Sequence, residues 1–351
     1  MVQDIFKKKE GAVMERYSRQ MLFEPIGKEG QKKLAKRHVL IVGTGALGSG
    51  TAEILARAGV GKITVIDRDY VEESNLHRQH LYSEEDARMR WPKAAAAEKR
   101  LGEINGLIDV RSIVGEADAS LLEELAPEID LILDGTDNFE TRFLINDVSQ
   151  KYRIPWIFGS CVGSFGMTYT IIPGKTPCLQ CLLKQIPMQG LTCDTVGVIG
   201  PVVQMVAAYQ AAEALKILTD HLEALRPSFV SFDLWKNDHL EIKAGALKDN
   251  SCLSCGKQPS YPFLSREART KTTVLCGRDT VQVRPAEKRE MVLPALASQW
   301  RKAGWKVEGN PYLLSIEKDD LRIVLFQDGR ALIHGTKDEM MAKKIYQTLL
   351  G

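Results

Sequence analysis

The chain has 351 residues, of which 44% are hydrophobic and 26% are charged. These fractions are typical of a globular protein with a core, and they exclude disorder over most of the chain. The 47 basic and 45 acidic residues leave a net charge of +2, which gives no support for a nucleic-acid-coating or polybasic membrane-binding protein. The length allows one large domain or two.

Neither an export signal nor a membrane span is expected. The first ten residues contain no apolar stretch long enough for a signal peptide. The most apolar long segment, 201–218, contains two glutamines, a glutamate and a lysine, which indicates a buried helix rather than a bilayer span. We therefore expect a cytoplasmic protein with no membrane partner.

A strand, a glycine-rich turn, a helix and a second strand follow the polar first 36 residues. The apolar run His38–Val42 predicts a buried parallel strand. The small residues of Ser49–Ala58 predict a helix, which Gly59 would end in a left-handed conformation. The next strand, Lys62–Asp67, ends on a carboxylate. This βαβ pattern is typical of the start of a Rossmann-like domain.

The alternation of strands and helices continues to about residue 243. Strands are expected at 108–114, 130–134, 156–158, 165–172, 228–234 and 239–243, and helices at 94–101, 119–125, 138–152 and 201–218. The last three strands alternate apolar and polar residues, as antiparallel strands do. We predict a Rossmann-like α/β fold whose mixed sheet is parallel in its N-terminal half and antiparallel in its C-terminal half.

The composition changes after Cys255. Residues 256–262 have the glycine and proline content of a linker. Short strands are expected at 272–283 and 312–316, two more beside a hairpin turn at Asp328-Gly329, and helices at 293–302 and 337–350. The pattern predicts a first domain over residues 1–255 and a small α+β domain of unknown role over residues 263–351.

Gly43, Gly45 and Gly48 form a G-x-G-x-x-G pattern between the first strand and the first helix. Such glycines allow a tight turn, a bare backbone beside phosphate, and close packing of helix on strand. Asp67 lies 19 residues after Gly48, where a carboxylate can accept both ribose hydroxyls. Taken alone, these features favour a nicotinamide or flavin dehydrogenase, and a glycine turn without a ligand is the plainer alternative.

Polar side chains gather after two strand ends, which is the edge where α/β proteins bind ligands. Arg78 can clamp phosphate oxygens in a bidentate fashion, and Lys93 stands at the expected start of a helix. Asp134 and Asp137 stand at the carboxyl end of another expected strand, and one of these acids could hold Mg²⁺ through carboxylate oxygen. Each residue alone could be a solvated loop charge, but their joint placement favours a site.

Eight short motifs occur in an order that resembles one protein family. They are Arg16-Tyr-Ser-Arg-Gln20, Gly43-Thr-Gly-Ala-Leu-Gly48, Asp67-Arg-Asp69, Ser74-Asn-Leu-His-Arg-Gln79, Pro92-Lys93, Asp134-Gly-Thr-Asp-Asn138, Cys178-Leu-Gln-Cys181 and Cys252-Leu-Ser-Cys255. With them, residues 14–255 resemble the ThiF/MoeB/HesA family, bacterial relatives of the ubiquitin-activating enzymes. The family's loop has two adjacent glycines where this chain has Gly45-Ala46, and we expect the extra methyl group to affect nucleotide affinity only slightly.

The resemblance implies an adenylyltransferase. Family members use Mg-ATP to adenylate the C-terminal Gly-Gly carboxylate of a small ubiquitin-like sulfur carrier, and they release pyrophosphate. By this resemblance Arg78 and Lys93 bind phosphate, Asp137 is the acidic magnesium residue, and Asp67 binds ribose. Arg19 matches an arginine that family members lend across a homodimer interface. The implied nucleotide shell consists of Gly43, Gly45, Ala46, Gly48, Asp67, Asp69, Ser74, Asn75, Arg78, Gln79, Lys93, Asp137 and Asn138.

The helix expected at 201–218 is a candidate for part of that dimer contact, or it is an ordinary core helix.

The seven cysteines are too few for a disulfide scaffold, and four of them form two Cys-x-x-Cys pairs. The pairs offer four sulfur ligands for zinc, or they are unrelated. With the resemblance, Cys178, Cys181, Cys252 and Cys255 are expected to hold a structural Zn²⁺.

Cys193 matches a family cysteine that lies near the carrier tail. In some thiamin-pathway members this cysteine joins the carrier in a persulfide-derived linkage, which would make a cysteine desulfurase a further partner. We predict a role in sulfur handoff, and the alternative is a loop thiol with no essential role. Cys161 and Cys276 have the character of small apolar packing residues.

Several functions remain open from the sequence. The segment Gly197-Val-Ile-Gly-Pro-Val-Val203 is closer to the thiamin-thiazole members than to the molybdopterin members, so a ThiS-like carrier is favoured over a MoeB-type substrate. A nicotinamide oxidoreductase would leave Asn75, Arg78 and the cysteine pairs unexplained. A non-catalytic scaffold that binds a ubiquitin-like protein is disfavoured because the expected active-site cations, among them Arg19, are intact.

Overall fold

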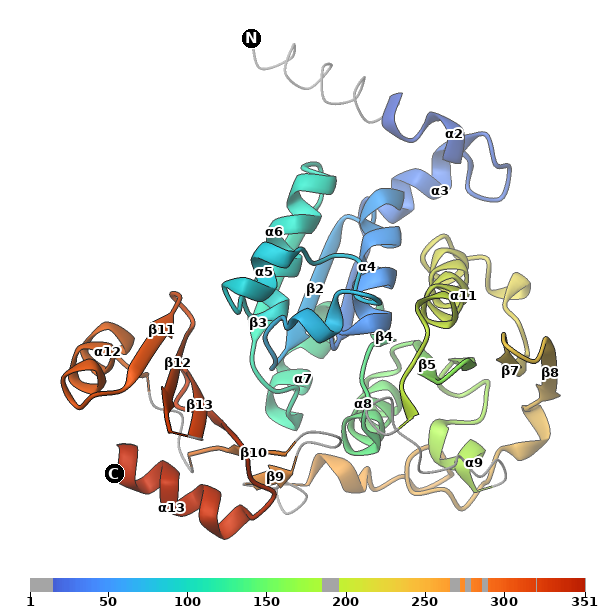
Figure 1. Cartoon of the computed structure of the whole chain (residues 1–351). Helices are drawn as coiled ribbons and strands as arrows, with labels where there is room; N and C mark the ends of the chain where they lie inside the picture. Colours follow the sequence, from blue (N-terminus) through green and yellow to red (C-terminus); the bar gives the residue numbers. More distant parts are fainter. Residues whose placement is uncertain are drawn as a thin grey trace.

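The computed structural model describes residues 15–184, 196–265, 272–274, 279–285, 290–319 and 321–350. Figure 1 shows a larger body that contains a sheet between helices, and a smaller C-terminal part beside α5 and β3. In the part of the chain that is described, none of the helices combines the length and the hydrophobicity needed to span a bilayer.

The larger sheet has eight strands in the order β3-β2-β1-β4-β5-β6-β7-β8. They are β1 (His38–Val42), β2 (Lys62–Asp67), β3 (Asp109–Val114), β4 (Leu131–Asp134), β5 (Trp156–Val162), β6 (Phe165–Ile171), β7 (Ser228–Asp233) and β8 (Asp238–Lys243). The first five strands pair in parallel, and β6, β7 and β8 pair antiparallel. The predicted Rossmann-like mixed sheet is therefore confirmed.

Helices bury both faces of this sheet. One face is covered by α3 (Gly27–Leu34), α4 (Ala46–Ala58), α6 (Lys93–Ile104) and α11 (Gly200–Leu218), and the other by α7 (Ala119–Leu125), α8 (Phe139–Tyr152) and α9 (Leu179–Leu183). Val39 and Ile41 of β1 face the first layer, whereas Leu40 and Val42 face the second. Burial on both faces explains why this strand is apolar throughout.

Two elements differ from their predicted bounds in an instructive way. Helix α4 begins at Ala46, three residues before the predicted start, and ends as expected with Gly59 in a left-handed conformation. Strand β5 continues to Val162 because it pairs with β6 along its whole length. Gly159 and Ser160 interrupt its apolar pattern, so the sequence predicts only the first three residues of this strand.

The second sheet, which we call the C-terminal sheet, has the order β11-β12-β13-β14-β10-β9. Its strands are β9 (Thr272–Val274), β10 (Thr280–Val283), β11 (Lys306–Gly309), β12 (Leu313–Lys318), β13 (Leu321–Phe326) and β14 (Ala331–His334). The predicted hairpin at Asp328-Gly329 joins β13 to β14. The run 272–283 contains two strands instead of one, and the exposed strand β11 was not predicted.

The two faces of the C-terminal sheet have different partners. One face packs against α12 (Leu293–Lys302) and α13 (Glu339–Leu350) through residues such as Ile316 and Leu325. The opposite face carries Leu313, Val324, Phe326 and Leu332, which pack against Tyr70 of the larger body. The C-terminal sheet is therefore enclosed between its own helices and the body, and the domain boundary at 256–262 stays a prediction.

The remaining helices are short. They are α2 (Ser18–Met21), α5 (Glu84–Arg88), η1 (Glu73–Asn75), η2 (Ala126–Glu128), η3 (Leu222–Ala224), η4 (Gly245–Leu247) and η5 (Pro262–Leu264). Several of them position residues of the candidate site.

Candidate active site

The glycine-rich turn lies between β1 and α4 and is closely packed. Gly43 has a φ of +86°, a conformation that favours glycine. A side chain at Gly48 or at Gly135 would overlap the carbonyl oxygen of Gly43. Around Gly45, in contrast, the nearest atoms to such a side chain would be 3.9 Å away. Gly135 was not predicted to be part of this turn, although it stands in the Asp-Gly-Thr-Asp motif.

Asp67 connects the end of β2 to the glycine-rich turn. Its Oδ2 accepts hydrogen bonds from the backbone N–H of Thr44 at 2.7 Å and from the Thr44 hydroxyl at 3.1 Å. Its Oδ1 accepts from the backbone N–H of Asp69 at 2.7 Å. The side chain is buried, and this burial raises the pKa of Asp67. Thr44 is a further structural residue of the site that sequence reasoning missed.

Lys93 and Asp69 are held together by backbone and side-chain contacts. The backbone N–H of Lys93 donates to the carbonyl oxygen of Asp69 at 2.8 Å. Lys93 Nζ lies 3.4 Å from Asp69 Oδ2, and the lysine side chain is 6% exposed. An isolated bridge between Tyr70 and Pro92 continues this pairing. The structure thus places a buried ammonium group next to the end of β2.

The segment after β2 positions three predicted nucleotide ligands. Asn75 is buried, and its Oδ1 accepts from the backbone N–H of Glu72 at 3.2 Å. Arg78 Nη1 donates to the carbonyl oxygen of Ser74 at 2.8 Å. Gln79 is 3% exposed, and its Oε1 has no hydrogen-bond partner among the described residues. A buried amide oxygen without a partner is costly unless a ligand satisfies it.

The two acids at the carboxyl end of β4, Asp134 and Asp137, have different environments. Asp134 is buried, with Oδ2 accepting from Arg142 Nε at 2.9 Å and Oδ1 accepting from the Thr136 hydroxyl at 2.7 Å. Asp134 therefore fixes the loop that follows β4 through its contacts with Thr136 and Arg142. Asp137 is exposed, which leaves its carboxylate available to a metal ion. Asn138 caps α8 by accepting from the backbone N–H of Thr141 at 2.9 Å. The buried Arg142 pair was not predicted.

Arg19 is not brought to this site by its own chain. Arg19 is an exposed residue of α2, and the neighbouring Gln20 donates to the carbonyl oxygen of Ala58 at 2.8 Å. Ala58 is the last residue of α4, whereas the glycine-rich turn precedes its first residue. A helix of this length separates the two ends by about 18 Å. Leu22 and Phe23, next to Arg19, are 73% and 61% exposed.

The four cysteines of the two Cys-x-x-Cys pairs converge. Their Sγ atoms all lie within 4.8 Å of one another, and the separations are 3.9 Å for Cys178–Cys181, 3.6 Å for Cys178–Cys252 and 3.5 Å for Cys181–Cys255. Tetrahedral zinc–thiolate bonds would place sulfur atoms roughly 3.8 Å apart. The cluster therefore fits a tetrahedral metal ion.

The other cysteines lie elsewhere. Cys161 is buried and packs with Val202, Val206 and Phe232, in keeping with the expected packing role. Cys193 and Cys276 lie outside the described residues.

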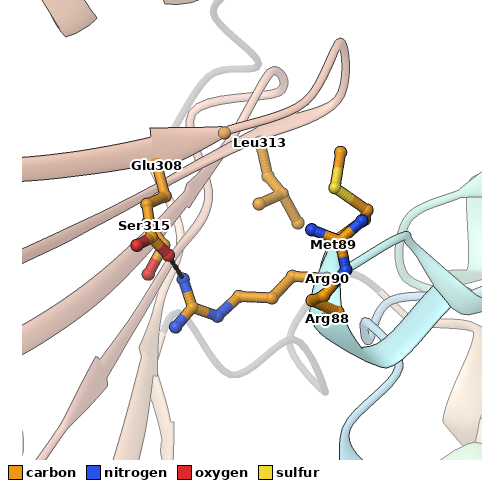
Figure 2. Close-up of a pocket in the computed structure, with 7 residues that line it drawn as sticks. Arg88, Met89, Arg90, Glu308, Leu313 and Ser315 are labelled. Carbon is orange, nitrogen blue, oxygen red and sulfur yellow. Dashed lines mark hydrogen bonds and ion pairs between the residues drawn. The ribbon is translucent and has the colours of Figure 1, made fainter. Parts of the chain in front are cut away.

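A cavity of about 300 Å³ lies between the end of α5 and the C-terminal sheet. Figure 2 shows Arg90 extending across it toward Glu308 and Ser315. Its lining residues are Arg88, Met89, Arg90, Glu308, Gly309, Leu313 and Ser315. None of them is a predicted nucleotide ligand, so this hollow is separate from the candidate active site.

Comparison with known proteins shows which proteins this chain is similar to. The ThiF family model matches residues 17–254. The "Sulfur carrier protein ThiS adenylyltransferase" of Bacillus subtilis (strain 168) is 53% identical over 336 residues, covering 96% of this chain and 99% of that protein. The "Sulfur carrier protein adenylyltransferase" of Thermus thermophilus is 35% identical over 70% of this chain and 92% of its own. A solved structure of the microcin C7 biosynthetic enzyme MccB with N-formylated MccA has a TM-score of 0.60 and 26% identity, covering 69% of this chain and 75% of that chain.

Proposed function

The chain belongs to the ThiF family, and we propose that it is an ATP-dependent adenylyltransferase that activates a ubiquitin-like sulfur carrier of the ThiS type. The observation that carries the proposal is the likeness to the ThiS adenylyltransferase of B. subtilis, which extends over nearly the whole of both chains. The site described above supplies the groups that such a reaction needs. The product would be a carrier whose terminal carboxylate is joined to AMP, with release of pyrophosphate.

The chemistry requires positive charge where the reaction develops negative charge. The carrier carboxylate attacks the α-phosphorus of ATP, and cations must offset the charge that accumulates on the phosphate oxygens. Lys93 is largely desolvated and would supply one cation, and Arg78, whose Nη1 donates to the Ser74 carbonyl, would supply another. Asp67 would accept the ribose hydroxyls, and Gln79 Oε1 is free to accept from the nucleotide.

Magnesium and zinc would have different sites and roles. Asp137 is the carboxylate that would hold Mg²⁺, whose charge would offset that of the triphosphate. Cys178, Cys181, Cys252 and Cys255 would hold a structural Zn²⁺. Since Cys178 and Cys181 flank the start of α9 and the other pair follows β8, the ion would tie two distant segments together. Thiolate ligands are in keeping with the reducing, cytoplasmic location expected from the sequence.

We propose a homodimer, because Arg19 lies near the C-terminal end of α4, whereas its own glycine-rich turn is at the N-terminal end of that helix. Arg19 would complete the partner's site, and the exposed Leu22 and Phe23 supply apolar area for the contact. Helix α11 buries most of its residues within its own chain, so we propose that it contributes less to the dimer contact than Leu22 and Phe23 do.

Cys193 would receive or transfer sulfur after adenylation, with a cysteine desulfurase as the sulfur source.

The experiment that tests this function uses purified protein, Mg-ATP and carriers that end in Gly-Gly. Mass spectrometry should detect the AMP adduct of a thiamin-type carrier, and omission of ATP should abolish it. An adduct formed only with a molybdopterin-type carrier would reassign the substrate. Absence of an adduct with either carrier would contradict the proposal. Titration with NADH, which should give no binding, separates this activity from that of an oxidoreductase.

A further inference from the structure

The C-terminal sheet contacts the part of the larger body that carries Asp69 and Lys93. In that region residues 69–71 pair with residues 91–93, in what we call the site ladder. The backbone N–H of Lys93 donates to the Asp69 carbonyl at 2.8 Å, and that of Val71 donates to the Trp91 carbonyl at 2.9 Å. Any displacement of this ladder would move both charged groups together.

One set of contacts joins the C-terminal sheet to Arg68, the residue directly before the 69–71 side of the site ladder. Arg330 is 2% exposed, and its Nη1 donates to the carbonyl oxygen of Arg68 at 2.6 Å. The side chain of Arg68 forms an ion pair of 3.0 Å with Glu116. Glu116 in turn accepts from Gln282 at 3.0 Å and pairs with Arg284 at 2.9 Å. The backbone between Asp67 and Asp69 is thus held from the C-terminal sheet.

A second set of contacts reaches the turn that leads into the other side of the ladder. Asn310 Nδ2 donates to the carbonyl oxygens of Met89 and Arg90, at 3.0 and 3.1 Å. Arg90 has a φ of +48°, a left-handed conformation that is unfavourable for a residue with a side chain. Its guanidinium pairs with Glu308 at 2.9 Å and with Glu317 at 3.3 Å, as Figure 2 shows for Glu308. These contacts stabilise the turn four residues or fewer before Lys93.

Apolar contacts complete the attachment. Tyr70, in the middle of the site ladder, is 2% exposed and packs with Leu313, Val324, Phe326 and Leu332. The ring of Trp91 lies against the ring of Tyr312, with 5.7 Å between centroids. Residues on both sides of the ladder therefore contact the C-terminal part of the chain, Tyr70 through one face of its sheet and Trp91 through Tyr312, directly before β12.

We propose that the C-terminal sheet is a brace for the ATP site, and that Arg330 is its main positioning residue. The brace holds Asp69 and Lys93 in the geometry that binds Mg-ATP. Arg330 Nη1 donates to the Arg68 carbonyl, whereas its buried Nε and Nη2 have no hydrogen-bond partner among the described residues. Loss of the bond to Arg68 would leave the buried guanidinium without a hydrogen bond, which is costly, so this carbonyl is held in place. The inference rests on the proposed assignment of Asp69 and Lys93 to nucleotide binding, and it gives a role to residues that the ThiF family match does not cover.

The test compares Arg330→Gln and Asn310→Ala with the full-length parent protein. Each folded variant is titrated with a non-hydrolysable ATP analogue and Mg²⁺, and KM values are measured for ATP and for the carrier. We expect Arg330→Gln to raise the Kd for the analogue at least tenfold and Asn310→Ala to raise it severalfold, while the KM for the carrier stays within twofold. Arg330→Lys should fall between the parent and Arg330→Gln.

Two control variants separate positioning from stability. Ile316→Val alters the opposite, helix-covered face of the same sheet, and Lys337→Gln removes an exposed ion pair with Asp279. Both should bind the analogue like the parent. Unchanged affinity in Arg330→Gln and Asn310→Ala would overturn the brace, as would equal weakening in Ile316→Val. If Arg330→Gln does not fold, the result for Asn310→Ala decides alone. A parent protein that fails to bind the analogue would overturn the site assignment and the brace with it.

Discussion

Lys93 Nζ lies 3.4 Å from Asp69 Oδ2 with only 6% of the lysine side chain exposed. This is a long contact for an ion pair, since charge-assisted N–H···O bonds are usually about 2.7–2.9 Å. The ammonium group is therefore desolvated without being tightly neutralised. Such a group is well suited to donate to a phosphate oxygen as a second, stronger partner.

The first prediction concerns this lysine. Replacing Lys93 with Gln removes the positive charge but retains most of the volume, so the fold should survive. We expect kcat/KM for ATP to fall by roughly 10²–10³-fold, the usual effect of deleting one group that stabilises transition-state charge. Steady-state measurement of adenylate formation checks this. A loss below threefold would show that Lys93 is not at the reacting phosphates.

The second prediction concerns the pH dependence that Asp67 introduces. Burial raises the pKa of this carboxyl above its ordinary value of 3.8. The folded state therefore holds the proton more tightly than the unfolded state does. The stabilising contribution of Asp67 is complete below pH 3.8 and is lost as the pH rises through the raised pKa. Affinity for ATP should instead increase as the pH rises through the raised pKa, because the ionised carboxylate is the better acceptor for ribose hydroxyls.

Asp67→Asn isolates both effects. The difference in Tm between the parent and this variant, followed upward from pH 3.8, should show the parent losing stability relative to the variant. The Kd for an ATP analogue should improve with pH more steeply in the parent than in the variant. Parallel stability curves for the two proteins would show that the pKa of Asp67 is not raised in the folded state, and parallel Kd curves would show that its ionisation does not affect nucleotide binding.

The third prediction concerns the cysteine cluster. The purified protein should contain one zinc ion per chain, and Cys252→Ser should lose it. Removal of a structural zinc ion is expected to lower the free energy of unfolding by at least about 3 kcal/mol. Metal analysis and thermal denaturation check both points. Cys161→Ser, which changes a cysteine packed away from the cluster, should keep its zinc, and equal loss in both variants would contradict the assignment.

The fourth prediction concerns the shared site of the homodimer. Arg19→Ala and Lys93→Gln should each be inactive when alone. When the two proteins are mixed and allowed to exchange subunits, half of the dimers are mixed, and each mixed dimer has one intact site. Activity should then recover to about a quarter of the parent value. No recovery after verified subunit exchange would show that Arg19 acts within its own chain or not at all.

The sequence predicts the Rossmann-like body well because its signals are local. The strand His38–Val42 and the helix Ala119–Leu125 are observed with the predicted bounds. Strand β5 was predicted too short because Gly159 interrupts its pattern, and only its pairing with β6 extends it. Strand β11 was missed because an exposed edge strand carries no apolar run.

The site was predictable to the extent that its residues stand in motifs at strand ends. The motifs do not show which polar atoms already have hydrogen-bond or ion-pair partners within the chain. Asp134 and Asp137 are equivalent acids in sequence, yet only Asp134 is buried against Arg142. The hydrogen bond from Arg330 to the carbonyl oxygen of Arg68, directly before the site ladder, joins residues 262 positions apart, and no local pattern indicates such a pairing.

Carrier-dependent exchange of labelled pyrophosphate into ATP tests the central claim most directly, because it reports reversible formation of the carrier adenylate. The parent protein should catalyse exchange with a thiamin-type carrier that ends in Gly-Gly, and not with the same carrier lacking its last glycine. Arg78→Ala should abolish exchange while the carrier still binds in a pull-down. No exchange with either a thiamin-type or a molybdopterin-type carrier would contradict the claim.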